Sequence, residues 1–245
     1  MIPPHRCVST VPNLVDGSVM RTVLVPVQAD TLRRCSTRMH SRADTEGDAN
    51  TDNRLMRDYG QRMGLGLKLS DCFLRPMKWA DREQVRGWRN QPAVRRVMFT
   101  DHEIGSGEHC RWFHQVLSSD AYSYHVFEYQ GRPVGLVGFF KLESASGSGE
   151  WTFYIAEGNV PRGTGIAMLY TGLDFFFGSR RMSSLFANVI AWNEESLALH
   201  RRFGFVQDST KQIERADGVH EVVCLVLTKA KWEGHRDAMS SFIRE

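Results

Sequence analysis

Gly163, Thr164 and Gly165 place two glycines at the start of a stretch with helical apolar spacing. The first N–H groups of a helix have no partner inside the helix, and the positive end of the helix dipole lies beside them. Glycine lets an anion approach those amides because it carries no Cβ. The stretch lacks the GK[ST] of a phosphate-binding loop, and Met168 stands where a dinucleotide fingerprint requires its third glycine. The turn therefore predicts a phosphate site, with a purely structural glycine turn as the alternative.

A second motif, WNEESLALHRRFGF, occupies residues 192–205. Together with the glycine turn it resembles the GNAT superfamily of N-acetyltransferases. In that superfamily a (Q/R)xxGxG/A turn binds the pyrophosphate of acetyl-CoA, and an Nxx(S/A)xxLYxxxGF motif lies beside the pantetheine arm and the thioester. The resemblance covers residues 73–232 and implies acetyl-CoA as cosubstrate. The cofactor contacts that it implies are Ile155, Ala156, Arg162, Gly163, Thr164, Gly165, Ile166, Asn193, Ser196 and His200.

Two positions depart from this family pattern. Val160 stands where the turn usually begins with Gln or Arg, so Arg162 is expected to supply the charge beside the phosphates. His200 stands at the frequent Tyr position, and an imidazole with an ordinary pKa of about 6.5 can protonate the departing CoA thiolate or orient a water that does. The alternatives are that His200 only packs on its helix and that Asn193 only caps that helix.

The general base has weaker support in the sequence. Acetyl transfer from a thioester requires a neutral amine, a polarised carbonyl and an exit for the thiolate. Related enzymes often have a carboxylate near the end of the fifth strand, where this chain has Ala and Trp at 191–192. The candidates that remain are Glu157 and Glu150, with Glu143 and His102 behind them. Each of these is otherwise a solvated surface group.

The acceptor pattern is WRNQPAVRRVMFTDHEIGSGEHCRWFHQVL, residues 88–117. It is similar to N-acetyltransferases that acetylate the 4-amino group of a UDP-linked amino-dideoxy sugar in the biosynthesis of pseudaminic acid, a sugar of bacterial flagellins. That resemblance implies a UDP-amino-sugar substrate, with guanidinium groups on the diphosphate and an apolar wall beside the sugar or the uracil. The substrate contacts expected on this basis are Arg89, Asn90, Arg95, Met98, Phe99 and His102. The alternative is that the aromatic residues are core and the arginines are solvated.

Two other functions stay open at this stage. A GNAT enzyme acting on a protein N-terminus, such as that of a ribosomal protein, or on another small amine would carry the same cofactor motifs. A peptide acceptor would favour an open acidic groove over the arginines of residues 89–96. A non-catalytic acyl-CoA-binding module would also keep the glycine turn, but it would release no CoA in the presence of an amine.

The elements that must position these residues follow the order β-α-α-β-β-β-α-β-α-β-β, which predicts a mixed α/β sheet. Helices are expected at residues 80–90, 106–120, 163–178 and 193–204. Ser106 is a plausible helix cap, Pro92 is expected to end the first helix, and tight turns are expected at Gln130-Gly131 and Asp217-Gly218. The resemblance further implies the α+β GNAT fold. That fold has a mostly antiparallel sheet of about seven strands, splayed between the fourth and fifth, with about four flanking helices.

Composition limits the class of protein. A chain of 245 residues with 42% hydrophobic residues can bury one substantial core. The formal charge of +3 and the scattered basic residues predict neither a nucleic acid nor a membrane as partner. The five cysteines show no CxxC spacing, so neither a disulfide framework nor a metal site is expected, and a cytoplasmic location is favoured. A monomer or homodimer is expected.

Residues 1–66 differ from the rest of the chain, because they contain no Lys and because residues 37–54 are nearly free of apolar side chains. Such a segment buries too little surface to offset its ordering entropy. We therefore expect a disordered or poorly ordered extension over residues 1–66, or a true translation start at Met56 or Met63. The acetyltransferase domain is expected at residues 67–235, with a C-terminal tail at residues 236–245.

Overall fold

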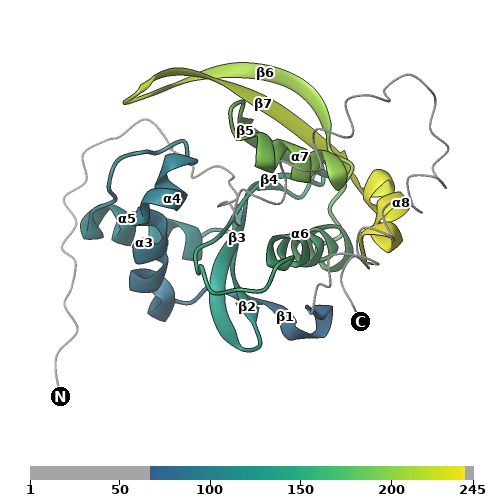
Figure 1. Cartoon of the computed structure of the whole chain (residues 1–245), viewed down its shortest axis with the longest axis horizontal. Coiled ribbons are helices and arrows are strands. Elements are labelled where there is room, and N and C mark those ends of the chain that lie inside the picture. The colour runs from purple at the N-terminus through teal and green to yellow at the C-terminus, as the bar shows by residue number, and fades with distance from the viewer. Residues whose placement is uncertain (1–66, 241–245) are drawn as a thin grey trace.

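The computed structural model describes residues 67–240, so the expectation for residues 1–66 lies outside the described residues. The described chain forms one seven-stranded sheet in the order β1-β2-β3-β4-β5-β7-β6 (Figure 1). Its strands are β1 (Cys72–Pro76), β2 (Tyr122–Tyr129), β3 (Arg132–Glu143), β4 (Ser148–Ile155), β5 (Ser184–Ile190), β6 (Val206–Arg215) and β7 (Gly218–Thr228). Strands β4 and β5 pair in parallel and all the others antiparallel, which confirms the mixed, mostly antiparallel sheet.

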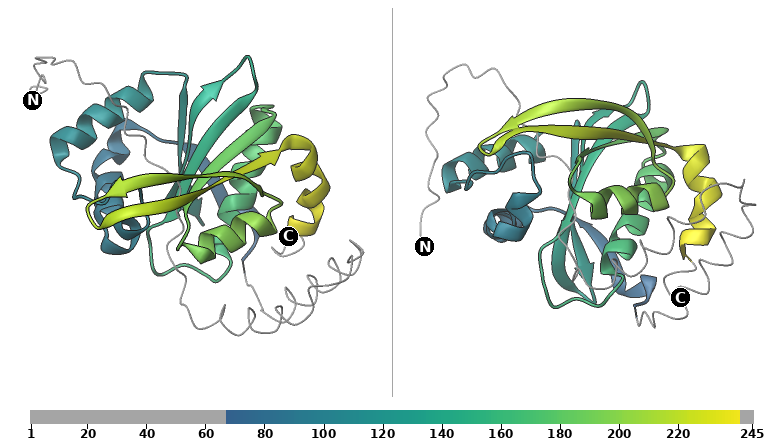
Figure 2. Two further views of the ribbon diagram at one scale, coloured as in Figure 1. Left: turned by 90° about the horizontal axis from the view of Figure 1, so that it is seen from above. Right: turned by 45° about the horizontal axis from the view of Figure 1, so that its top comes forward.

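Helices cover both faces of this sheet. Within residues 67–240 the α-helices are α3 (Arg82–Asn90), α4 (Pro92–Arg96), α5 (Ser106–Leu117), α6 (Thr164–Asp174), α7 (Glu194–Arg202) and α8 (Lys229–Ser240). Short 3₁₀ or π segments occur at Leu69–Asp71, Trp79–Asp81 and Phe175–Ser179. Helices α3, α4 and α5 lie on one side and α6, α7 and α8 on the other (Figure 2). The expected number of about four was too low because α4 and α8 were not foreseen. The domain boundary expected at residue 235 falls inside α8.

Local signals at the helix ends were partly misjudged. Pro92 begins α4 instead of only ending α3, because proline at the first helical position needs no N–H and already has a helical φ. Ser106 is the first residue of α5, and Gly105 occupies the cap position. The turn at Gln130 and Gly131 is confirmed, with both φ angles positive at 50° and 73°.

The closing hairpin turns one residue earlier than expected. Its two-residue turn is Ala216-Asp217, because Arg215 pairs directly with Gly218, the last strand pair of the β6–β7 ladder. Gly218 has a φ of 123°, a conformation that glycine adopts without steric cost.

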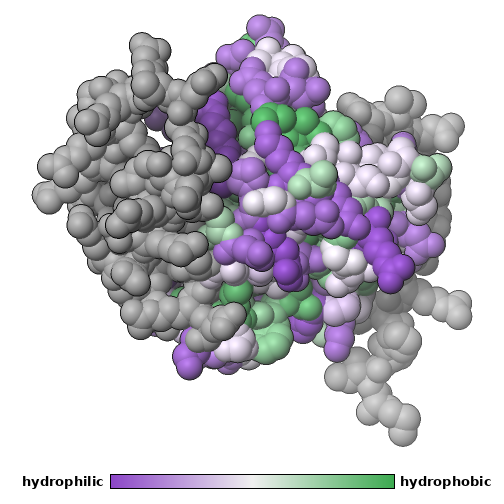
Figure 3. Space-filling model, turned by 90° about the vertical axis from the view of Figure 1, so that its right-hand side faces the viewer, coloured by the Kyte–Doolittle hydropathy of each residue, from purple (hydrophilic) through white to green (hydrophobic). Residues whose placement is uncertain are grey.

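The surface is mixed in character. Figure 3 shows that hydrophilic residues cover most of the coloured face on the α8 side, with hydrophobic residues in small groups. Among residues 67–240, no helix is both long and apolar enough to cross a bilayer.

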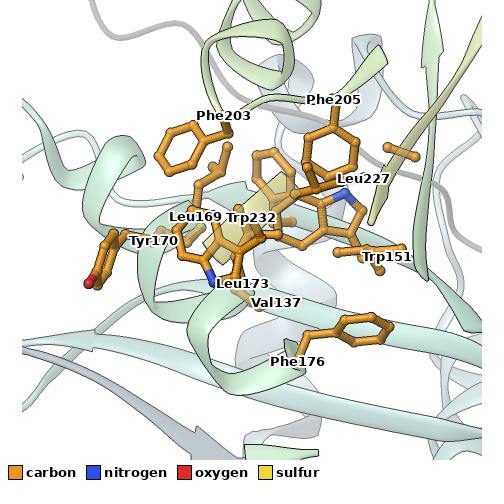
Figure 4. Packing of buried hydrophobic residues seen from close by; sticks show 14 of the residues in the cluster. Val137, Trp151, Leu169, Tyr170, Leu173, Phe176, Phe203, Phe205, Leu227 and Trp232 are labelled. Atoms are coloured by element: carbon orange, nitrogen blue, oxygen red, sulfur yellow. The ribbon is translucent and has the colours of Figure 1, made fainter. Parts of the chain in front are cut away.

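Two hydrophobic layers hold the helices to the sheet. On the side of α6, α7 and α8 the core includes Trp151, Phe176 and Trp232 (Figure 4). On the side of α3, α4 and α5 it includes Trp88 and Phe113. Each fully buried large side chain contributes about 1.5–3 kcal/mol, so the two layers fix where the ends of β4 and β5 lie.

The sheet opens between its two parallel strands. Strands β4 and β5 pair at only three positions, Ser148–Ser184, Gly149–Leu185 and Glu150–Phe186. Beyond that point residues 151–155 and residues 187–190 diverge, so the C-terminal ends of the two strands bound an opening that we call the wedge. The expected splay between the fourth and fifth strands is confirmed.

Candidate active site

The end of β4 supplies main-chain groups to the wedge. The N–H of Ala156 donates to the Val134 oxygen of β3 at 2.9 Å, and the N–H of Glu157 donates to the same oxygen at 3.2 Å. Main-chain groups of successive strand residues point to opposite sides, so the N–H of Ile155 points away from β3 and toward the wedge. Of the cofactor contacts expected here, Ile155 has a suitably directed amide, whereas the amide of Ala156 is already bonded within the sheet.

The glycine turn connects β4 to α6. Gly163 caps α6 in the left-handed conformation, with φ 94° and ψ −8°, which glycine adopts without strain. Thr164 is buried and closes the turn, because its Oγ1 donates to the Pro161 oxygen at 2.6 Å. The N–H groups of Gly165 and Ile166 belong to the first helical turn, and both residues are half-buried. The helix start can therefore bind an anion, but through main-chain amides and not through the Thr164 hydroxyl.

Charge and shape beside this turn come partly from a residue that the sequence did not suggest. Arg162 is exposed, as expected for a residue that meets phosphates. Arg132, at the start of β3, donates from Nη2 to the Asn159 oxygen and so pins the loop before the turn. A hollow of about 540 Å³ lies there, lined by Tyr129, Gln130, Arg132, Asn159, Val160 and Pro161. Only a strand register, and no local motif, brings Arg132 to this loop.

Asn193 serves as a helix cap and still has free donors. Its Oδ1 accepts from the Ser196 N–H at 3.2 Å, which caps α7. Its Nδ2 is buried and has no hydrogen-bond partner among residues 67–240. A buried amide without a partner is costly, so this nitrogen is suited to donate to a polar group entering the wedge. Ser196 itself is fully buried in α7.

His200 does not have the geometry of a general acid. Its ring is fully buried and packs against Trp151, Phe153 and Phe205. Nδ1 lies 2.7 Å from the Ser196 oxygen, which only accepts, so Nδ1 carries the proton and donates it there. Burial lowers the pKa of His200 to about 4, which leaves the imidazole neutral near pH 7. This geometry favours the packing alternative over a proton donor, because the remaining ring nitrogen, Nε2, is a buried acceptor without a partner among residues 67–240.

The two carboxylates proposed as bases lie at opposite ends of β4. Glu157 follows the open end, is half-buried, and accepts a hydrogen bond at Oε1 from Trp88 Nε1 at 2.8 Å. Glu150 lies at the closed end, where Lys141 Nζ contacts Oε1 at 2.5 Å and Asn188 Nδ2 donates to Oε2 at 2.9 Å. The two are seven positions apart, which corresponds to at most about 23 Å along an extended chain. The structure therefore does not bring Glu150 to the wedge opening, whereas it does bring Glu157 there.

The segment between α4 and α5, residues 97–105, is called the acceptor loop here. Arg89 is fully buried, and its Nη2 donates to the Thr100 oxygen of this loop at 2.7 Å. Asn90 donates to the Ile104 oxygen at 2.9 Å and accepts from the Ile104 N–H at 2.8 Å. These two residues hold the loop from its inner side, and Nε and Nη1 of Arg89 are buried without a hydrogen-bond partner among residues 67–240. Burial lowers the pKa of Arg89 to about 10, which keeps the guanidinium charged near pH 7.

The other residues expected to contact the acceptor differ in how far they are buried. Met98 is fully buried in the core beneath α4, so it cannot form a substrate wall. His102 is exposed, and its Nε2 lies 3.1 Å from Glu108. Arg95 and Phe99 are half-buried, so these two and His102 remain as the expected contacts with some surface open to a ligand.

The comparisons with known proteins agree with this architecture. A family model described as the acetyltransferase (GNAT) domain matches residues 72–206. The SPbeta prophage-derived uncharacterized N-acetyltransferase YokL of Bacillus subtilis (strain 168) is 25% identical over 126 residues, which cover 50% of this chain and 70% of that protein. A spermidine N-acetyltransferase from Vibrio cholerae, solved in complex with CoA and spermine, matches with a TM-score of 0.62 and 18% identity over 67% of this chain and 99% of that chain. A dodecameric structure of the Vibrio cholerae spermidine N-acetyltransferase matches with a TM-score of 0.57 and 18% identity, over 66% and 96%.

The family match spans more than half of the chain, and it includes the wedge, the glycine turn and Asn193. The outward amide of Ile155, the first turn of α6 and the unpartnered Nδ2 of Asn193 fit a cosubstrate that carries both a diphosphate and amide groups. The chain belongs to the GNAT acetyltransferases and is an acetyl-CoA-dependent N-acetyltransferase.

Proposed function

We propose that this enzyme acetylates the 4-amino group of a UDP-linked amino-dideoxy sugar, with Glu157 as the general base. The observation that carries the catalytic part is the hydrogen bond between Trp88 Nε1 and Glu157 Oε1. It fixes a carboxylate just beyond the open end of β4, and it leaves Oε2 for an incoming amine or for a bridging water.

The reaction then requires one bond to form and one to break. The amine nitrogen bonds to the acetyl carbonyl carbon, the carbon–sulfur bond breaks, and CoA leaves as a thiolate. The proton that the nitrogen loses goes to Glu157, directly or through water, and the thiolate takes a proton from water. The neutral, enclosed imidazole of His200 takes no part in these proton transfers.

The cosubstrate is proposed to lie along the wedge. The amides of Gly165 and Ile166 and the charge of Arg162 would meet its diphosphate. The Ile155 N–H and the Asn193 Nδ2 would meet its amide and acetyl oxygens. Acetyl-CoA supplies the activated acyl group, and these residues position it so that its carbonyl faces the amine.

The sugar acceptor is supported by the residue pattern between positions 88 and 113 and by the basic character of α4. Arg96 is exposed and Arg95 is half-buried, and two guanidinium groups beside the acceptor loop favour an anionic acceptor over a polyamine. Arg89, Asn90 and Met98 give this proposal no direct contact, because they hold or underlie the acceptor loop.

The decisive experiment measures thiol release from acetyl-CoA with a panel of acceptors. The panel contains UDP-linked 4-amino sugars, the same sugars without the UDP group, spermidine, and peptides with free N-termini. We expect the highest kcat/KM with the UDP-linked sugars and a loss of at least about tenfold when UDP is removed, since an anion–guanidinium pairing is then missing. A preference for spermidine or for the peptides would contradict the sugar proposal while leaving N-acetyl transfer intact.

A further inference from the structure

We propose that Arg215, at the tip of the β6–β7 hairpin, is a positioning residue that fixes the acceptor loop and thereby controls acceptor affinity. This proposal rests on the proposed function, because it assumes that the acceptor binds beside the acceptor loop. Nothing in the sequence motifs points to residue 215, which lies 119 positions from Arg96, the end of α4.

The hairpin extends past the strand that it pairs with. Strand β7 is in register with β5 up to the Ile190–Val222 pair, and the Ala191 N–H still donates to the Glu221 oxygen. Residues 218–220 and the turn before them therefore project by about 10 Å beyond the end of β5. In Figures 1 and 2 this tip reaches across the molecule toward α4 and α5.

The tip makes specific contacts where it arrives. Arg215 Nη1 donates to the oxygens of Arg96 and Met98, both at 2.9 Å. Arg215 Nε lies 3.6 Å from Asp101 Oδ2, and the Ala216 N–H donates to the same oxygen at 3.1 Å. Only 4% of the Arg215 side chain is exposed, so these contacts form in a partly desolvated setting where a charge-assisted bond is strong.

The acceptor loop is therefore held on both sides. Arg89 and Asn90 bind it from the inner side, and Arg215 and Ala216 bind it from the outer side. Ordering such a loop costs conformational entropy for each residue. When the loop is already fixed before the acceptor binds, that cost does not reduce acceptor affinity.

The contacts of Arg215 also complete a closed series of contacts that surrounds the open end of the wedge. Strand β4 is joined to α3 by the Glu157–Trp88 bond, and the acceptor loop is joined to the hairpin by Arg215. The hairpin is joined to β5 through β7, and β5 returns to β4 at Glu150. Breaking the Arg215 link frees the wall on the acceptor side, while the glycine turn and Asn193 lie elsewhere and keep their geometry.

The test compares Arg215→Ala and Arg215→Lys with a matched control, Arg236→Ala. Arg236 also forms an arginine–carboxylate pair, with Asp174 at 2.6 Å, but it lies on α8, away from the acceptor loop. For the acceptor acetylated fastest in the panel, we expect KM to rise about tenfold in Arg215→Ala, while KM for acetyl-CoA changes less than about twofold. Arg215→Lys should recover part of the affinity, because one ammonium group can reach one of the two carbonyls. The control variant should match the wild type.

A second measurement needs no acceptor. Amide hydrogen exchange in residues 97–105 should be faster in Arg215→Ala than in the wild type, with no change around Gly163–Ile166. Unchanged exchange in the acceptor loop would overturn the proposal even if no amine in the panel reacted. An equal rise in KM for both substrates would also overturn it, because the hairpin would then support the whole wedge and not the acceptor side.

Discussion

On the cofactor side of the wedge, the Ile155 amide points toward the opening and the Asn193 Nδ2 has no hydrogen-bond partner among residues 67–240, whereas on the acceptor side the side chains of residues 89, 90 and 215 donate to main-chain oxygens of the same chain. The first arrangement follows from local geometry, since a glycine turn at a helix start directs amides outward wherever it occurs. The second arrangement depends on tertiary packing. A residue pattern therefore indicates a cofactor site more directly than it indicates acceptor contacts, because some patterned side chains stabilise the loop that surrounds the acceptor.

The largest effect should come from the residue that lies between the two sides. Glu157→Gln keeps an oxygen for the Trp88 bond but cannot take a proton, so we expect kcat to fall by about 100-fold or more. Glu143→Gln is the control, because Glu143 is exposed and lies at the closed end of the sheet. Steady-state kinetics with both variants would separate them, and equal activity in Glu157→Gln and the wild type would remove the base from our account.

A charge placed at the helix start should affect the cofactor side alone. Substitution of Gly163 would strain its left-handed conformation, so Gly165→Asp is the cleaner variant. A carboxylate in the first turn stabilises a helix but repels a diphosphate, so KM for acetyl-CoA should rise about tenfold without a fall in melting temperature. Gly234→Asp on α8, where an added Cβ meets open space, is the control. An unchanged KM for acetyl-CoA would place the diphosphate elsewhere.

Asn193 allows the cap and the cofactor contact to be separated. Asn193→Ser keeps an oxygen that can cap α7 but removes the Nδ2 donors, so KM for acetyl-CoA should rise about fivefold at unchanged stability. Asn193→Ala should show the same rise in KM and also lose about 1 kcal/mol of unfolding free energy. If Asn193→Ser bound acetyl-CoA as the wild type does, Asn193 would be a cap and nothing more.

The smallest effect on turnover is expected at His200. His200→Phe should leave kcat nearly unchanged between about pH 6 and 9, because the wild-type imidazole is already neutral there. A clear loss of kcat would restore an acid–base role for the imidazole.

The same residue should be visible in stability instead. The pKa of His200 is lowered on folding to about 4, so its neutral form stabilises the fold above about pH 6.5, and this contribution is lost as the pH falls toward 4. The loss is on the order of 3 kcal/mol, and urea unfolding at pH 7 and pH 4.5 should show a smaller decrease for His200→Phe than for the wild type.

The fold was predictable in its order of elements and in the splay, because strand and helix periodicities and the Gln130-Gly131 turn are local. Helix α4 was missed because it has only five residues and begins at a proline, and α8 because few of its residues are apolar. Within the candidate site, the glycine turn and Asn193 were predicted from their motifs, and their cofactor contacts stay predictions. The hydrogen bond of Glu157 and the burial of Arg89 depend on packing between distant segments, for which the sequence carries no local signal.

Glu150 contacts both Lys141 on β3 and Asn188 on β5. It is the last residue of β4 that pairs with β5, so the two parallel strands separate from this point. Beyond Glu150, β4 leaves β5 but stays paired with β3 as far as Ile155, a length of about 17 Å. A tilt of about 3° between β4 and β5 at Glu150 therefore changes the separation of their far ends by about 1 Å. Displacements of that size are enough to misalign a nucleophile and an acyl carbon. Glu150, which never contacts the substrate, can thus determine the distance between the C-terminal ends of β4 and β5 and with it the width of the active site.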